Sequence, residues 1–341
     1  MKYIINSERL RSKAYAYRAL NVDLYYPTKV NFEEQLITLI DSIVSGYEVD
    51  SISHLELLIN KFGISPKRIL YSYPLKKTDE IQRAIALGVT RFVIDNFEEV
   101  EFVVNTSNDV MLSILVRISI ADFVQDGSDY LFKWGVSINE ANRIIDVIRK
   151  RHRFEGVSFY LPQEVNTLEN FQRVLNAINQ TAFVKDIGVI DVGGGITPNT
   201  LSALLPIIHS TIGGSPRVII EPGLHFVGPC IEMITEVLAI REYGKFRAVF
   251  LDTGIYNGLI DAVIKKKHFE IYPDGYNSDN TSICEYVVCG RSSDVSDFLG
   301  HYYLPADLKK GDTLHITECG AYCSEMETHF YKEQSLIYEV I

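Results

Sequence analysis

The chain has 341 residues, of which 47% are hydrophobic and 23% charged, and its formal net charge at pH 7 is −11. These values are typical of a globular chain long enough for one large domain and a smaller one, and they exclude a disordered or fibrous protein. The acidic surplus disfavours nucleic acid and anionic membranes as partners, because both require a basic surface. A cationic or zwitterionic small molecule is a better match.

Localisation and redox state follow from the absence of several signals. No stretch is long and apolar enough to span a membrane, and the first residues, MKYIINSERL, lack the apolar core of a signal peptide. The 5 cysteines lie in the last third of the chain without a CxxC pair, which argues against a zinc site and a closed disulfide framework. We therefore expect a cytoplasmic protein with reduced cysteines and no bound metal.

From residue 22 to about residue 222, short β-branched or aromatic runs alternate with amphipathic segments of helical period, such as 32–45, 78–88 and 139–152. This alternation predicts repeated βα units and a parallel sheet. The predicted strands are 22–28, 47–50, 68–72, 91–94, 111–118, 156–160, 187–192 and 217–220. Eight such units match a (β/α)8 barrel of the TIM type, and a doubly wound open sheet is the alternative.

After Pro222 the pattern changes to short strand-like runs separated by Gly and Asn, at 230–243, 245–252, 282–290 and 314–323. No long helical pattern recurs, so this part is predicted to be a mostly β domain of sandwich or barrel type. The predicted domains are therefore a barrel at 6–228 and a C-terminal β domain at 229–341, to which residues 1–5 add a strand.

Three features fall at the carboxyl ends of predicted strands, where (β/α)8 barrels carry their reactive groups. Lys29 follows the first strand, Gly193, Gly194 and Gly195 follow the seventh, and Glu221 ends the eighth. Each has an ordinary explanation, namely a surface lysine, a tight turn and a salt-bridged carboxylate. Together they suit pyridoxal 5′-phosphate, with a lysine for the Schiff base, backbone amides for the phosphate and a carboxylate for the pyridine nitrogen.

The sequence resembles the fold-type III pyridoxal phosphate decarboxylases that act on ornithine, diaminopimelate and arginine, with alanine racemase as a distant relative in fold. The resemblance runs nearly end to end, and the motifs occur in the family's order. The matching segments are YYPTKVN, DSISHLE, LVRI, KWGV, DVGGGI, EPG, GRSSDVSD and GAY. Lys76 and Lys77 are similar to the family's lysine after the third strand, although the start of a solvated helix explains them equally well.

The resemblance implies further cofactor-binding residues. Asp50 and Arg117 would lie around the cofactor ring, Ser53 near its rim and Tyr322 on the phosphate, and Gly223 belongs to the EPG motif. Ordinary alternatives are a helix cap for Asp50, an ion pair for Arg117 and a core position for Tyr322.

The resemblance also implies how the substrate binds. Asp294 corresponds to the residue that selects the distal amine of the substrate across a dimer interface, which implies a homodimer with shared active sites. Asp252, in the turn FLDTG, and Arg291, where the family has proline, are further candidates for substrate binding.

Two departures from the family concern catalysis. Tyr160 replaces a histidine that stacks on the cofactor, and an aromatic ring can still stack there. Ser293 replaces a cysteine thought to return a proton to the product, and serine is a much weaker acid. The proton would then come from Tyr160, from Cys323 or from a water held by Ser293. Leu224 also replaces an arginine that contacts the phosphate.

The predicted function is α-decarboxylation of an amino acid with a cationic distal group, such as ornithine, lysine, diaminopimelate or a modified amino acid of specialised metabolism, as in antibiotic biosynthesis. Lys29 is both the cofactor-binding lysine and a candidate proton donor. Racemisation, decarboxylation-dependent transamination and a non-catalytic regulator stay open as alternatives. Retention of Lys29, the three glycines and Glu221 counts against the regulator.

Overall fold

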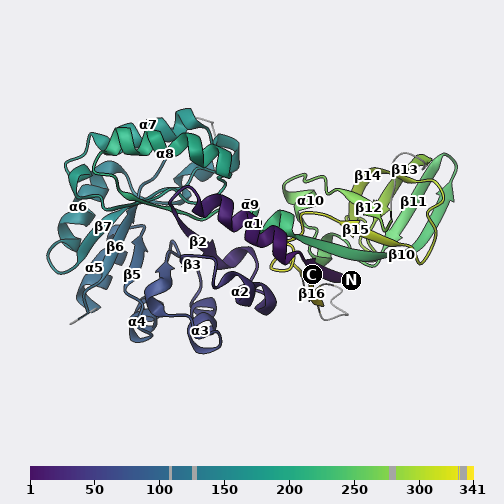
Figure 1. Cartoon of the computed structure of the whole chain (residues 1–341), viewed down its shortest axis with the longest axis horizontal. Helices are drawn as coiled ribbons and strands as arrows, with labels where there is room; N and C mark the ends of the chain where they lie inside the picture. The colour runs from purple at the N-terminus through teal and green to yellow at the C-terminus, as the bar shows by residue number, and fades with distance from the viewer. Residues whose placement is uncertain (107–109, 125–128, 276–281, 329, 331–335) are drawn as a thin grey trace. The chain divides into compact units, whose positions relative to one another are not determined.

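The computed structural model describes residues 1–106, 110–124, 129–275, 282–328, 330 and 336–341 (Figure 1). The chain divides into two compact units. The barrel unit consists of Lys13–Thr28 and Ile40–His225, and the β unit consists of Met1–Ser12, Lys29–Leu39 and Phe226–Ile341. The segment Lys29–Leu39, which directly follows the first barrel strand in sequence, is thus grouped with the β unit.

The barrel unit contains a closed barrel of eight parallel strands, β2 to β9 in sequence order. The strands are β2 (Asp23–Pro27), β3 (Gly46–Val49), β4 (Ile69–Tyr71), β5 (Arg91–Ile94), β6 (Ser113–Arg117), β7 (Arg153–Ser158), β8 (Val189–Asp191) and β9 (Arg217–Ile220). Pairing of β2 with β9, through Asp23 with Ile219 and Leu24 with Ile220, closes the barrel. The predicted (β/α)8 fold is confirmed, and the open-sheet alternative is wrong because an open sheet leaves its edge strands unpaired.

The strands are short, nearly continuous apolar runs, because the barrel interior and the surrounding helices bury both of their faces. One interior cluster takes a residue from each of six strands: Tyr25, Leu70, Val93, Leu115, Val189 and Ile219. The chain therefore packs its barrel interior with side chains, as barrels of eight strands do.

Amphipathic helices connect the strands. They are α1 (Ser7–Arg18), α2 (Glu34–Ile40), α3 (Ile52–Asn60), α4 (Thr78–Ala86), α5 (Phe97–Thr106), α6 (Ile138–Ile148), α7 (Leu168–Asn179), α8 (Pro198–Ile212) and α9 (Gly223–Val227). Ser137, Thr167 and Thr197 cap the first turns of α6, α7 and α8 with their side-chain oxygens. Figure 1 shows α7 and α8 lying side by side on the barrel.

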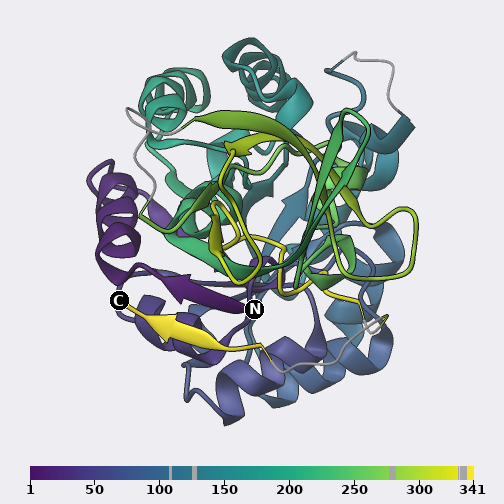
Figure 2. The ribbon, with the colours of Figure 1, turned by 90° about the vertical axis from the view of Figure 1, so that its right-hand side faces the viewer.

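The β unit is built on one sheet in the order β12-β15-β10-β11-β13-β14, to which β1 is added at β10 and β16 at β1. Its elements are β1 (Lys2–Ile5), β10 (Ile231–Tyr243), β11 (Phe246–Leu251), α10 (Asp261–Ile264), β12 (Ile271–Pro273), β13 (Ile283–Cys289), β14 (Phe298–Pro305), β15 (Thr313–Ile316) and β16 (Tyr338–Val340). The N-terminal strand β1 pairs with β10 antiparallel and with β16 parallel, and Figure 2 shows β1 beside β16. The predicted mostly β character of this part is confirmed.

Two details of the β unit differ from the sequence prediction. The run predicted at 314–323 stays a strand only to Ile316, because Glu318 and Tyr322 have positive φ angles of 55° and 65° that a strand does not accept. Strands β12, β14 and β16 are absent from the prediction, because β12 and β16 have only 3 residues each and Gly300 weakens the strand pattern of β14. Within the described residues, no helix combines the length and the hydropathy needed to cross a bilayer.

Candidate functional site

The three consecutive glycines form a turn between β8 and α8. Gly193 and Gly195 have φ angles of +68° and +71°, which only glycine adopts without strain. The turn leads directly into α8, where the Thr197 side chain accepts a hydrogen bond from the Thr200 amide. A strand, a glycine turn and a helix N-terminus in succession form a geometry that binds anions, because backbone N–H groups and the helix dipole face the same way.

Asp191, the last residue of β8, stabilises this turn through its carboxylate. It is 1% exposed, and its carboxylate accepts hydrogen bonds from the Gly193 amide (3.0 Å) and the Ser158 hydroxyl (2.7 Å). Burial raises the pKa of Asp191 against the lowering effect of these two hydrogen bonds. The hydrogen bond from the Gly193 amide to Asp191 therefore stabilises the turn. The sequence analysis missed Asp191, although it is the first residue of the DVGGGI segment.

Glu221 lies against the glycine turn through the backbone. Its amide donates to the Gly193 carbonyl at 2.8 Å, and a Cβ added to Gly194 would lie 2.7 Å from the Glu221 carbonyl oxygen. The chain then turns into α9, with the Gly223 amide bonded to the Glu221 carbonyl at 2.8 Å. The structure thus brings together the predicted residues that follow the seventh and eighth barrel strands.

Tyr160 is held next to the same turn. It follows β7 by two residues, and a Cβ on Gly193 would approach its ring to 3.1 Å. The ring of Trp134 meets Tyr160 edge to face, with ring centroids 5.9 Å apart. A small pocket beside these rings is lined by Arg117, Ile118, Ile120, Leu131, Trp134, Tyr160 and Pro162.

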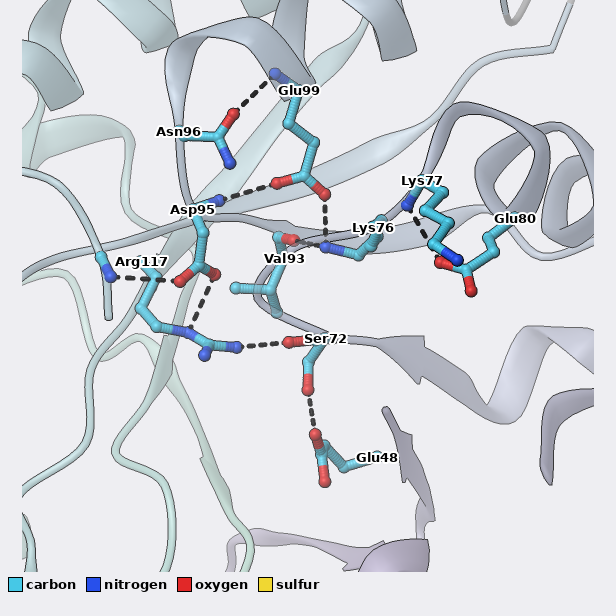
Figure 3. A network of polar contacts seen from close by, with 11 residues as sticks. Glu48, Ser72, Lys76, Lys77, Glu80, Val93, Asp95, Asn96, Glu99 and Arg117 are labelled. Carbon is cyan, nitrogen blue, oxygen red and sulfur yellow. Dashed lines mark hydrogen bonds and ion pairs between the residues drawn. The ribbon is translucent and has the colours of Figure 1, made fainter. Parts of the chain in front are cut away.

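Arg117 ends β6 and takes part in a polar network at the carboxyl ends of the strands (Figure 3). Its guanidinium lies 3.3 Å from Asp95 and donates to the Ser72 carbonyl at 2.6 Å, so the predicted alternative of an ion pair is present. The Ser72 hydroxyl donates to Glu48, a residue of β3 that is 2% exposed. Sequence reasoning missed Glu48, because no motif marks a single carboxylate within an apolar strand.

Asp50 directly follows β3, and Ser53 lies in the first turn of α3. The cap of α3 is Ser51, whose hydroxyl accepts from the His54 amide at 3.2 Å. The helix-cap alternative for Asp50 is therefore wrong. The Ser53 hydroxyl is 3.2 Å from that of Ser51, so both serines lie at the start of this helix.

In the β unit, the lysine segment is joined to the GAY segment. Lys29 lies in a single 3-10 turn, Thr28–Val30. The Val30 carbonyl accepts from the Tyr322 amide at 2.7 Å, and the Asn31 side chain donates to the Gly320 carbonyl at 3.1 Å. A Cβ on Gly320 would lie 2.0 Å from the Val227 carbonyl oxygen, so this position requires glycine. Two motifs that are nearly 300 residues apart in the sequence thus share one loop contact.

The GRSSDVSD segment forms a loop organised by Asp297, which is 4% exposed. Its carboxylate accepts from the amides of Ile255 (2.9 Å) and Ser292 (3.0 Å), which joins this loop to the one after β11. Sequence reasoning missed this role, although Asp297 is the last letter of the motif.

Asp294, Ser293 and Arg291 are carried by the same loop. The Asp294 carboxylate accepts from the Ser296 amide at 2.8 Å and from the Tyr256 hydroxyl, and these hydrogen bonds lower its pKa. Arg291 and Ser293 are both exposed to solvent.

Asp252 has partners within the β unit. Its carboxylate accepts from the Thr235 hydroxyl and from the Glu236 amide at 3.0 Å, both on β10. Burial alone would raise the pKa of Asp252, but these hydrogen bonds and the Met1 ammonium, 2.9 Å from the carboxylate, outweigh it and lower the pKa. A structural role within the sheet accounts for these contacts, and a substrate role for Asp252 stays a prediction.

Comparison with known proteins identifies the family. Residues 4–228, more than half of the chain, match the family described as "Pyridoxal-dependent decarboxylase, pyridoxal binding domain". The chain belongs to this family. It is similar to ornithine decarboxylase of Schizosaccharomyces pombe, with 25% identity over 93% of this chain and 78% of the relative. It is also similar to diaminopimelate decarboxylase of Aquifex aeolicus, with 23% identity over 96% of this chain and 83% of the relative.

Solved structures share the fold. The crystal structure of the Paramecium bursaria Chlorella virus arginine decarboxylase matches with a TM-score of 0.88 and 19% identity, over 99% of this chain and 96% of that chain. Diaminopimelate decarboxylase from Helicobacter pylori, complexed with L-lysine, matches with a TM-score of 0.86 and 22% identity, over 100% of this chain and 91% of that chain.

The cofactor of this decarboxylase family is pyridoxal 5′-phosphate. The barrel unit provides a cradle that fits its phosphate, because Gly193 and Gly195 use positive φ angles and Gly194 leaves no room for a Cβ. The carboxylate-bearing Glu221 is fixed at that cradle through its backbone. Within the described residues no cluster of His, Cys, Asp and Glu could hold a metal ion.

Proposed function

We propose that this decarboxylase-family chain removes the α-carboxylate of an amino acid as CO2, using pyridoxal 5′-phosphate bound at the carboxyl end of its barrel. The observation that carries the proposal is the glycine turn between β8 and α8, with Glu221 held against it by the 2.8 Å hydrogen bond to the Gly193 carbonyl. The backbone contact between the turn and Glu221 supports the proposal, because a pyridoxal phosphate enzyme needs an anion-binding turn for the phosphate and a carboxylate for the pyridine nitrogen.

The bound cofactor supplies an electron-accepting ring that would stabilise the electron pair left on the α-carbon when CO2 departs. Lys29 is proposed to anchor the cofactor covalently through its ε-amine. Glu221 would keep a proton on the pyridine nitrogen, and Tyr160 would pack on the ring face from its place beside the glycine turn. Arg117 and Asp50 would border the ring.

The remaining cofactor contacts are proposed from the resemblance together with the local geometry. Tyr322 would contact the phosphate from the loop that is bonded to Val30, the neighbour of the anchoring lysine. Ser53 lies in the first turn of α3, next to the cap Ser51, and would border the cofactor rim. Gly223, whose amide donates to the Glu221 carbonyl at 2.8 Å, is proposed as a further cofactor contact from the EPG motif.

The substrate is proposed to carry a cationic distal group. The lowered pKa of Asp294 keeps its carboxylate ionised, and an ionised carboxylate binds an ammonium group through charge-assisted hydrogen bonds. Ornithine, lysine and diaminopimelate meet this requirement. By the resemblance, Asp294 acts on the active site of a second subunit, and we infer a homodimer. Arg291, which precedes Asp294 by three residues on the same loop, is proposed as a further substrate contact.

The first experiment tests the cofactor. Purified chain loaded with pyridoxal 5′-phosphate should be yellow, and borohydride reduction should remove the absorption band and leave the cofactor covalently attached. Lys29→Ala should take up no borohydride-stable cofactor, whereas the exposed control Lys150→Ala should behave as the unmodified chain does. A colourless chain that binds no cofactor would end the proposal and would favour the non-catalytic regulator.

The second experiment tests the reaction and the substrate. Amino acids with and without a distal amine are screened for CO2 release, and products are identified by mass spectrometry. We expect an amine product from a substrate with a distal cation, and an increase of KM of about tenfold or more in Asp294→Asn with little change in Asp307→Asn. A D-amino acid or an aldehyde as the main product would instead support racemisation or decarboxylation-dependent transamination, which the replacement of the family's cysteine by Ser293 makes chemically reasonable.

A further inference from the structure

A buried ion pair lies behind the polar network at the carboxyl ends of the barrel strands (Figure 3). The Lys76 ammonium is 2.5 Å from a Glu99 carboxylate oxygen and donates to the Val93 carbonyl at 2.6 Å. Lys76 is 9% exposed and Glu99 is 5% exposed. The expectation of a solvated lysine at a helix start is therefore wrong for Lys76, because α4 begins two residues later and Lys76 turns inward.

The ion pair is linked to Arg117 by one residue. The second carboxylate oxygen of Glu99 accepts from the Asp95 backbone amide at 3.1 Å. The Asp95 side chain then contacts the Arg117 guanidinium at 3.3 Å and accepts from the Gly135 amide at 3.1 Å. Glu99 thus fixes the backbone of Asp95, and the Asp95 carboxylate in turn holds Arg117.

The far side of Arg117 is also held, because it donates to the Ser72 carbonyl at 2.6 Å. The charges of Arg117 and Glu48 both act on the Asp191 carboxylate, and Asp95 is an ion-pair partner of Arg117. A small shift of Asp95 would therefore change both the orientation of the guanidinium and the electrostatic potential around Asp191.

A buried ion pair is weak evidence for a stabilising role, because burial of two charges costs about as much as their attraction returns. Burial raises the pKa of Glu99 in spite of Lys76. The pair does hold backbone in place, because Glu99 accepts from the Asp95 amide and Lys76 donates to the Val93 carbonyl. We propose that Lys76 and Glu99 are positioning residues, which set the orientation of Arg117 toward bound pyridoxal 5′-phosphate through Asp95. This inference rests on the proposed place of Arg117 at the cofactor.

The test replaces both charges together, since a single substitution would leave the other charge buried and unpaired and could unfold the chain. The double variant Lys76→Met/Glu99→Leu keeps the volume but removes the hydrogen bond to Asp95. Its affinity for pyridoxal 5′-phosphate, measured by absorbance titration, should fall about tenfold while its melting temperature stays within a few degrees. The matched control is Arg83→Met/Glu56→Leu, which removes a more exposed ion pair between α3 and α4 and should leave the affinity unchanged.

Coupling to Arg117 distinguishes positioning from a general effect on the fold. In an Arg117→Met background, which itself should bind the cofactor more weakly, the Lys76/Glu99 double variant should add no further loss. An equal tenfold loss in both backgrounds would overturn the inference, and so would unmodified affinity in the double variant. If the unmodified chain binds no cofactor, the proposed function fails instead, so the two failures are distinguishable.

Discussion

The carboxylate of Asp297 offers the most direct test of how the β unit shapes its functional loops. It accepts hydrogen bonds from the amides of Ile255 and Ser292 at 2.9 Å and 3.0 Å, and it is 4% exposed. A Cβ on Gly254 or Gly290 would come within 2.2 Å of this carboxylate, so both backbones approach it closely. Asp297→Ala would leave the buried Ile255 amide and the partly buried Ser292 amide without their acceptor.

The expected cost follows from these two contacts. A hydrogen bond to a charged group contributes about 1.5–3 kcal/mol, so the loss of both should destabilise the two loops by roughly 3–6 kcal/mol. Exchange of the Ile255 and Ser292 amide protons should accelerate by on the order of a hundredfold or more, and the melting temperature of the β unit should fall by about 10 °C. Asp297→Asn should lose about half as much stability as Asp297→Ala, because the asparagine side chain keeps one oxygen acceptor.

Hydrogen exchange followed by NMR or mass spectrometry, together with thermal unfolding, gives both measurements. The exposed Asp307, near the end of β14, provides the control Asp307→Ala, for which neither quantity should change. Exchange rates in Asp297→Ala that match those of the unmodified chain would refute the reasoning, since they would mean that the two amides do not depend on this carboxylate.

Three further predictions concern the glycine turn and the ionisable groups near the proposed site. Gly194→Ala should weaken pyridoxal 5′-phosphate binding at least tenfold in an absorbance titration, because the new Cβ would lie 2.7 Å from the Glu221 carbonyl oxygen, whereas Gly188→Ala, with its nearest contact at 3.4 Å, should bind as the unmodified chain does. Burial raises the pKa of Asp191, so its contribution to stability is complete below the ordinary aspartate pKa of about 3.9 and is lost as pH rises through the raised value. The melting temperature of Asp191→Asn should therefore fall less steeply with pH across that window, and parallel curves would contradict this. Tyr256→Phe should raise the pKa of Asp294 toward its ordinary value in an NMR titration, because one of its hydrogen-bond donors is removed, and the exposed Tyr243→Phe should leave that pKa unchanged.

The barrel was predictable because each of its parts is local. Strand-forming runs alternate with helical periods from residue 22 onward, and in a closed parallel barrel neighbours in sequence are neighbours in space. The same alternation puts Lys29 after the first barrel strand, the glycine turn after the seventh and Glu221 after the eighth. For the β unit, the sequence predicted the class and the strand added by residues 1–5, which β1 confirms, but not the partners of that strand, because β1 pairs with β10 and β16 across the whole length of the chain.

The roles of individual polar residues were decided by the tertiary structure. Lys76 and Lys77 are adjacent and identical in sequence, yet Lys76 is buried against Glu99 while Lys77 is exposed. The Gly193 amide is occupied by Asp191, which no motif of three glycines reveals.

The sequence by itself thus determined the fold class and the order of the motifs, since both follow from periodicity and strand order. The partners of buried charges and amides depend on which side chains approach within about 3 Å after folding, and short-range hydrogen bonds of that kind leave no periodic signal in the chain.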